Sequence, residues 1–243
     1  MNDLVGKVKE RGGQSFTAKQ LYNTMHVSHA GYRFKNQGMA MACDWFPLLQ
    51  SDNGVRHNPW SEPRISVVEI GCGNGRLCVL MTGMSLDVTG VDIFDNEAVY
   101  DRPSYKFVQQ DLTKAPYPFS DNQFDYCISF DVLEHLPEET IDATLQEMGR
   151  IGRNIILAVS CTGGKPLHLT VKSPGWWLDK LIENCPDYTW KLLRNYERIK
   201  DSGEGDTGRS NISATDVRPL PDNQLITYAP LFHGKRGVIA NED

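Results

Sequence analysis

A buried strand that runs directly into three alternating glycines limits the folds open to this chain. Residues 65–70 are apolar or β-branched almost throughout, as in a strand covered on both faces. Gly71, Gly73 and Gly75 follow at once, before a stretch with helical spacing. Glycines at such a joint permit a tight turn and let a ligand approach the backbone amides closely. The segment therefore predicts the first strand, turn and helix of an α/β domain.

Strand-like and helix-like segments alternate after this turn. We expect strands at 86–91, 105–109, 124–130 and 154–159, with helices at 76–84, 138–150 and 174–183. Such alternation predicts a mostly parallel sheet with helices on both faces. Residues 188–199 and 225–229 are candidates for two closing strands.

The length of the chain and the pattern of its apolar residues predict the domain organisation. With 243 residues and 40% hydrophobic residues, the chain can build one sizeable core. Residues 1–60 predict an N-terminal helical extension, with helices at 17–26 and 34–49, and residues 61–243 form the main domain. The extension is either a lid over the site or an ordinary helical cover of the sheet. Residues 201–216 are polar and glycine-rich, which indicates a loop.

Composition excludes several classes of protein. The net charge of −6 gives no general attraction to nucleic acid, so nucleic acid is not expected as a partner. The N-terminus lacks the apolar core of a secretory signal, and no apolar run approaches the ~20 residues of a membrane span. Six scattered cysteines without a CxxC pair argue against disulfides and structural zinc. We expect a cytoplasmic protein with buried thiols and no metal.

Acidic residues stand where successive strands end. Asp92 ends the second predicted strand, Asp111 follows the third, and Phe130 and Asp131 follow the fourth. Because ligands of open α/β sheets bind outside the carboxyl ends of the strands, these residues should converge on one site. A carboxylate after the second strand can accept both hydroxyls of a ribose, which favours a nucleoside ligand. Arg76 occupies the place of the last glycine in a dinucleotide fingerprint and disfavours NAD.

The motifs EIGCGNG, VTGVDI, QQDL and FDYCISFDVLEHL together resemble those of class I S-adenosylmethionine-dependent methyltransferases. The similarity covers roughly residues 64–160. It implies a Rossmann-like, seven-stranded, mostly parallel sheet whose last strand is antiparallel, and S-adenosylmethionine as cofactor. It also implies a cofactor site made of Glu69, Gly71, Cys72, Gly73, Asn74, Gly75, Asp92, Ile93, Asp111, Leu112, Phe130 and Asp131.

The resemblance gives parts of this site separate roles. Glu69 and the glycine turn would surround the methionine part of the cofactor, and Asp92 would hold the ribose. Ile93 would lie against the adenine, whose edge Asp111 and Leu112 would contact. Phe130 and Asp131 would line the site near the sulfonium.

Methyl transfer to a hydroxyl benefits from a base, and two histidines are candidates. His135 lies in the EHL segment after the fourth strand, and His168 follows the fifth. An imidazole suits this work because its ordinary pKa is near 6.5. The transfer itself requires no metal. For both residues, a purely structural role is the alternative.

The function predicted from sequence is methyl transfer to oxygen or nitrogen of a small molecule, with sugars and nucleotides among the candidates. An RNA or protein acceptor is one alternative, and a non-catalytic subunit with the same fold is another. After the fourth strand stands Asp131-Val132-Leu133 in place of Asn/Asp-Pro-Pro-aromatic, so the resemblance does not extend to DNA amine methyltransferases.

Overall fold

The computed structural model describes residues 8–11, 14–16, 37–40, 42–51, 64–94, 104–161, 167–197 and 228–237. The helix predicted at 17–26 and the loop predicted at 201–216 lie outside the described residues.

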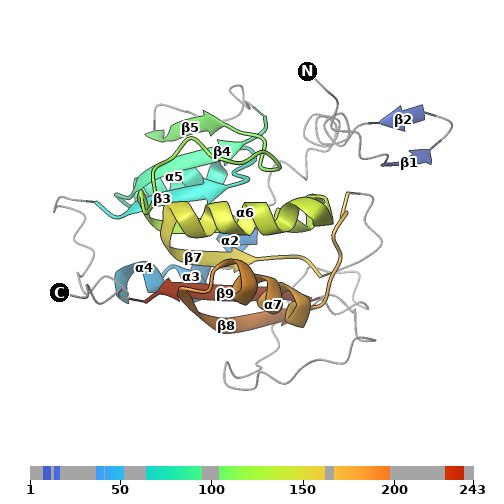
Figure 1. Cartoon of the computed structure of the whole chain (residues 1–243). Coiled ribbons are helices and arrows are strands. Elements are labelled where there is room, and N and C mark those ends of the chain that lie inside the picture. Colours follow the sequence, from blue (N-terminus) through green and yellow to red (C-terminus); the bar gives the residue numbers. More distant parts are fainter. Residues whose placement is uncertain are drawn as a thin grey trace.

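One seven-stranded sheet organises these residues (Figure 1). Its strands, in spatial order, are β5 (Lys106–Gln109), β4 (Asp87–Asp92), β3 (Ser66–Ile70), β6 (Phe124–Phe130), β7 (Gly152–Ala158), β9 (Tyr228–Arg236) and β8 (Tyr188–Glu197). The first five are parallel to one another, and β9 is antiparallel to both β7 and β8. The predicted Rossmann-like, mostly parallel sheet is confirmed.

Helices cover both faces of the sheet. On one face lie α6 (Glu138–Ile151) and α7 (Pro174–Asn184), and on the other lies α5 (Arg76–Gly83) (Figure 1). Successive side chains of the central strands lie on opposite faces of the sheet. Val68 belongs to the core beneath α6, and Val67 belongs to the core beneath α5. This two-sided burial explains why the central strands read as nearly continuous apolar runs.

The N-terminal part differs from the predicted helical extension. Among the described residues, a short antiparallel pair, β1 (Val8–Arg11) and β2 (Gln14–Phe16), is present where no strand was predicted. The helix predicted at 34–49 is instead three short helices, α2 (Gln37–Ala40), α3 (Ala42–Trp45) and α4 (Leu48–Ser51). Pro47 accounts for the break before α4, because it lacks an N–H group and disfavours helical geometry in the residue before it.

The last strand is also longer than predicted. The strand was predicted at 225–229, but β9 runs through Pro230 to Arg236. Pairing of β9 with β7 begins only at Leu231, so the missing N–H group of Pro230 removes no hydrogen bond on that side. The register of β8 also shifts between Leu192 and Arg194, close to the residue opposite Pro230. A proline is tolerated at such an irregular position.

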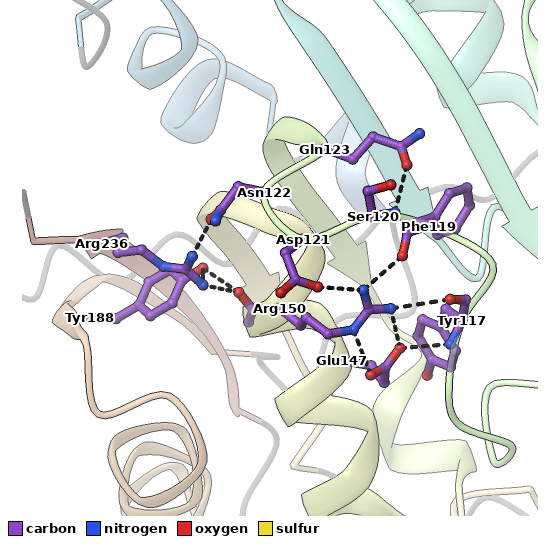
Figure 2. A network of polar contacts seen from close by, with 11 residues as sticks. Tyr117, Phe119, Ser120, Asp121, Asn122, Gln123, Glu147, Arg150, Tyr188 and Arg236 are labelled. Carbon is purple, nitrogen blue, oxygen red and sulfur yellow. Dashed lines mark hydrogen bonds and ion pairs between the residues drawn. The ribbon is translucent and has the colours of Figure 1, made fainter. Parts of the chain in front are cut away.

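An arginine-centred network fixes the chain between β5 and β6 to helix α6 (Figure 2). Arg150 binds Glu147 and Asp121 at 2.7 and 2.9 Å, and it donates to the carbonyl oxygens of Tyr117 and Phe119. Glu147 in turn accepts from the Tyr117 N–H at 2.6 Å. Nearby, Arg236 reaches Asn122. The network holds the loop that leads from the third strand end into β6.

The helices and the cysteines were also the subject of predictions from the sequence. No helix in the described ranges is long and apolar enough to cross a membrane. The five cysteines whose side chains are described are free and buried, as predicted.

Candidate functional site

The glycine turn after β3 adopts a conformation that ordinary residues rarely take. Gly71, Gly73 and Gly75 have φ angles of 73°, 55° and 74°. A Cβ atom on Gly71 would lie 2.5 Å from the methyl groups of Val132, and one on Gly75 would collide with the Tyr105 hydroxyl. Glycine is required at these two positions both for φ and for space. The three alternating glycines of the sequence are therefore explained by the turn itself.

Gly73 differs from the other two because no described atom lies close to the position of a Cβ atom on it. A Cβ atom there would meet no atom within 4 Å among the described residues. Its N–H group donates to Oδ2 of Asp92 at 2.8 Å. The turn thus presents open backbone beside a carboxylate, which is the arrangement that a bound nucleoside needs.

Asp92 is positioned by the end of β4 and by two backbone donors. Gly73 donates to Oδ2, and the Phe94 N–H donates to Oδ1 at 3.0 Å. Burial raises the pKa of Asp92 to about 6, because loss of hydration disfavours the charged form more than the backbone donors favour it. Each carboxylate oxygen keeps a further lone pair for a ligand hydroxyl.

Glu69 and Cys72 lie deeper than their neighbours in the motif. The Cys78 thiol donates to Oε2 of Glu69 at 2.9 Å, which ties this buried carboxylate to α5. The Cys72 side chain is buried against β4, where a Cβ atom on Gly90 would lie 2.9 Å from its sulfur. The Cys72 side chain is thus part of the core. Asn74, by contrast, accepts from the Arg76 N–H at 3.2 Å and helps to start α5.

The third strand end carries Asp111 and Leu112. The Asp111 carboxylate accepts from the Thr113 N–H and hydroxyl at 3.0 and 2.7 Å, and it pairs with Lys114 at 3.2 Å. The Leu112 side chain belongs to the core, while its carbonyl oxygen accepts from the Tyr117 hydroxyl. Ile93 lies at the end of β4, where its carbonyl oxygen accepts from Gln109.

At the fourth strand end, Phe130 and Asp131 mark the change from sheet to loop. The N-terminal helices cover Phe130: its ring lies 5.3 Å from that of Trp45, whose indole N–H donates to the Gly38 carbonyl oxygen. Asp131 has a φ of 60° and donates its N–H to Ala158 at 3.0 Å. A left-handed aspartate at a strand end stores strain of about 1 kcal/mol or more, a feature that concentrates at functional sites.

The two predicted histidines meet in space although 33 residues separate them. Their ring centroids are 4.7 Å apart and the rings are nearly perpendicular. His135 belongs to a single 3₁₀ turn, η3 (Leu133–His135), which follows β6. Thr170 fixes the segment that carries His168, since its N–H donates to the Glu134 carbonyl oxygen and its hydroxyl to that of Leu136.

Glu134 is the residue that the sequence analysis missed. Its side chain is fully buried next to the end of β7. There its Oε1 accepts a hydrogen bond from the Ser160 N–H at 3.1 Å. Burial and the neighbouring Asp131 carboxyl raise the pKa of Glu134 well above its usual range. A glutamate in the sequence between Leu133 and His135 gives no sign of this burial.

The parallel register brings these elements to one edge of the sheet. The carboxyl ends of β3, β4, β5 and β6 share that edge, with the glycine turn and Asp92 at its centre. The sequence profile of a methyltransferase domain family matches residues 68–154, which include all four strand ends. The match identifies this part of the chain, residues 68–154, as a methyltransferase domain. No curated protein aligns closely enough with the chain to count as a relative.

Solved structures of methyltransferases share the fold of this domain at low sequence identity. A Burkholderia thailandensis 1,6-didemethyltoxoflavin N1-methyltransferase, with its acceptor and S-adenosylhomocysteine bound, has a TM-score of 0.55 and 13% identity, over 90% of this chain and 87% of that one. A Haloferax volcanii putative methyltransferase, in complex with its Trm112 activator, has a TM-score of 0.51 and 14% identity, over 89% and 98%.

A third structure is that of WbdD, a bifunctional kinase-methyltransferase. It has a TM-score of 0.53 and 14% identity over 82% of this chain. The chain spans only 40% of the length of WbdD, so the similarity concerns the methyltransferase fold and not the whole of that protein.

Proposed function

We propose that this protein transfers the methyl group of S-adenosylmethionine to an oxygen or nitrogen atom of a small molecule, with sugars and nucleotides as the first candidates to test. The observation that carries the proposal is the open backbone at Gly73 beside the Asp92 carboxylate. The Burkholderia neighbour, which methylates a small molecule, supports this choice of acceptor class.

The residues at the strand ends fit a nucleoside cofactor. The Asp92 carboxylate has lone pairs for two ribose hydroxyls, and the open face of Gly73 leaves room for a chain that passes close to the backbone. Ile93, Asp111 and Leu112 are the proposed adenine contacts, at the next strand end. The Asp111 carboxylate, however, already accepts a hydrogen bond from Thr113 and pairs with Lys114. We therefore propose that backbone groups at this strand end also contact the adenine.

S-adenosylmethionine supplies an electrophilic methyl group on a sulfonium. The chain must bring the acceptor atom in line with that group, and positioning accounts for much of the rate in such displacements. The proposed acceptor side consists of Phe130 at the end of β6, of Asp131 and His135 just after it, and of His168 after β7. His135 donates its Nδ1 proton to the Leu167 carbonyl oxygen at 2.9 Å, which leaves the lone pair on Nε2.

This tautomer suits an imidazole that receives the proton of an acceptor hydroxyl. His168, with its ring 4.7 Å from that of His135, is the second candidate for the same role. Transfer to oxygen is therefore favoured over transfer to an amine, which needs no base.

The first experiment is calorimetric titration with S-adenosylmethionine, S-adenosylhomocysteine and NAD in parallel. Micromolar binding of the two sulfur nucleosides and none of NAD is expected. Release of S-adenosylhomocysteine is then followed over a panel of sugar nucleotides, nucleosides and phenols, with His168→Ala as the comparison. The variant should lose turnover and keep cofactor affinity; equal loss of both would make His168 a structural residue. No binding of either sulfur nucleoside would contradict the proposal and favour a non-catalytic role.

A further inference from the structure

We propose that Glu134, His135 and His168 form a binding site for one divalent transition-metal ion. One ligand atom from each of the three residues lies within 4.8 Å of the other two. The residues come from η3 and from the segment after β7, so the fold and not the sequence spacing brings them together. A search for paired cysteines or closely spaced histidines does not find such a site, which is why the sequence analysis predicted no metal.

Glu134 supplies the strongest reason for a cation at this place. Its side chain is fully buried, and its Oε2 has no hydrogen-bond partner among the described residues. A buried carboxylate oxygen without a partner costs several kcal/mol in proteins generally. The Asp131 carboxyl lies beside that of Glu134. A bound cation would satisfy the oxygen and offset the charge of both carboxyls.

His135 has the orientation of a metal-binding histidine. Its Nδ1–H group donates to the Leu167 carbonyl oxygen, so the ring's lone pair, through which an imidazole coordinates a metal, lies on Nε2. Histidines that bind metals usually donate their other ring N–H to a carbonyl or carboxylate in this way, because that bond fixes both tautomer and ring plane. Both His135 and His168 are half-buried, so an ion can reach them from solvent.

The supporting contacts hold the three groups in place without the ion. Ser160 donates to Oε1 of Glu134, which aligns the carboxylate at the end of β7. Thr170 is buried and donates to the carbonyl oxygens of Glu134 in η3 and of Leu136 just after it, and these two hydrogen bonds fix the segment that carries His168. A site whose ligands are held by such secondary contacts is largely formed before the metal binds.

The ligand set indicates which metals fit. Two imidazole nitrogens and one carboxylate oxygen suit Mn²⁺, Fe²⁺, Co²⁺ or Zn²⁺. They do not suit Ca²⁺, which prefers oxygen ligands throughout. Three protein ligands leave coordination positions open for water or substrate. The role that we assign to the ion rests on the proposed methyltransferase function: it would bind the acceptor hydroxyl and lower its pKa, so that the hydroxyl loses its proton to water. With the ion bound, the two histidines would act as its ligands, and this role would replace the base role described above for the metal-free site.

Metal binding is tested on the full chain after treatment with a chelator. Calorimetric titration with Mn²⁺ should show one site, and Co²⁺ should give visible absorption bands that report histidine coordination. Glu134→Gln and His168→Ala should each weaken Mn²⁺ binding at least tenfold. Glu138→Gln is the matched control, because this exposed glutamate lies four residues away and pairs only with Lys172 among the contacts described for it. If Glu134→Gln fails to fold, the Mn²⁺ affinity of His168→Ala tests the site instead, because the His168 side chain is only half-buried and its loss should leave the fold intact.

Wild-type protein that binds no Mn²⁺ or Co²⁺, or variants that bind them as the wild type does, would overturn the site. S-adenosylhomocysteine binding, measured in the same samples, tests the proposed function separately, because it does not need the ion. With an acceptor in hand, turnover should fall on chelation and return with Mn²⁺. Turnover that survives chelation in a protein shown to bind Mn²⁺ would overturn the catalytic role of the ion.

Discussion

The backbone N–H of Gly73 donates to Oδ2 of Asp92 at 2.8 Å, and this bond joins the turn after β3 to the end of β4. Two motifs that lie 19 residues apart are thereby held as one unit at the edge of the sheet. The same carboxylate binds the Phe94 N–H with its other oxygen. Asp92 therefore shapes the turn and also faces the space where we place the ribose.

Replacement of Asp92 by alanine should weaken S-adenosylhomocysteine binding at least tenfold, or about 1.4 kcal/mol. The variant loses both the acceptor for the ribose hydroxyls and the bond that positions Gly73. Calorimetry measures the effect. Asp87→Ala is the matched control, because Asp87 begins the same strand and forms an exposed pair with Lys106. Equal affinities in wild type and Asp92→Ala would remove the ribose assignment.

Cofactor affinity should also depend on pH through Asp92. Burial raises the pKa of this carboxyl to about 6, so it is ionised at about pH 8 and becomes protonated as the pH falls towards about 5. A protonated carboxyl is a poorer acceptor for ribose hydroxyls, so the dissociation constant should rise on the acid side. Titrations across this range should show a midpoint near the pKa. Asp92→Asn should bind weakly at every pH, and a variant that keeps the wild-type pH profile would show that another group is responsible.

Sequence alone was sufficient to predict the sheet and the motifs at its edge. Strands covered on both faces leave continuous apolar runs, and the glycine turn is visible because its φ angles exclude other residues. The family resemblance also predicted seven strands with the last one antiparallel. Within the seven-stranded sheet, the strand ends were predicted to within about two residues, except at β9, which was predicted at 225–229 and continues to Arg236.

The acceptor side could not be predicted in the same way. His135 and His168 were each visible as candidates, but their contact depends on how Thr170 and Leu167 bind η3. Glu134 is buried by the end of β7, and a local pattern carries no information about that burial. The break at Pro47 was visible in the sequence, yet apolar spacing across it favoured one longer helix.

The network around Arg150 should matter for stability and not for cofactor binding. Arg150→Met leaves the largely buried Glu147 carboxylate without its ion pair and frees the carbonyl oxygens of Tyr117 and Phe119. We expect a loss of about 2–4 kcal/mol in the free energy of unfolding. Urea denaturation measures it, with S-adenosylhomocysteine affinity as a second readout. Arg153→Met is the control, because its pair with Asp125 is exposed and should contribute less than about 1 kcal/mol. Similar losses in the two variants would contradict the structural role of the network.

The open face of Gly73 gives the most selective test of where the cofactor lies. Gly73→Ala adds a methyl group that meets no described atom within 4 Å, so the change costs only the strain of a positive φ, about 1–2 kcal/mol. The same methyl group would occupy the space assigned to the ligand, and S-adenosylhomocysteine binding should weaken at least tenfold.

Gly83→Ala provides the comparison, because it also meets no described atom but lies at the end of α5, away from the turn. Its cofactor affinity should equal that of the wild type, and its stability should rise slightly, by less than about 1 kcal/mol, because alanine favours the helix. Calorimetry and urea denaturation on both variants separate binding from folding. Wild-type affinity in Gly73→Ala would mean that the ligand does not approach the turn, and the cofactor would have to be placed elsewhere along the strand ends.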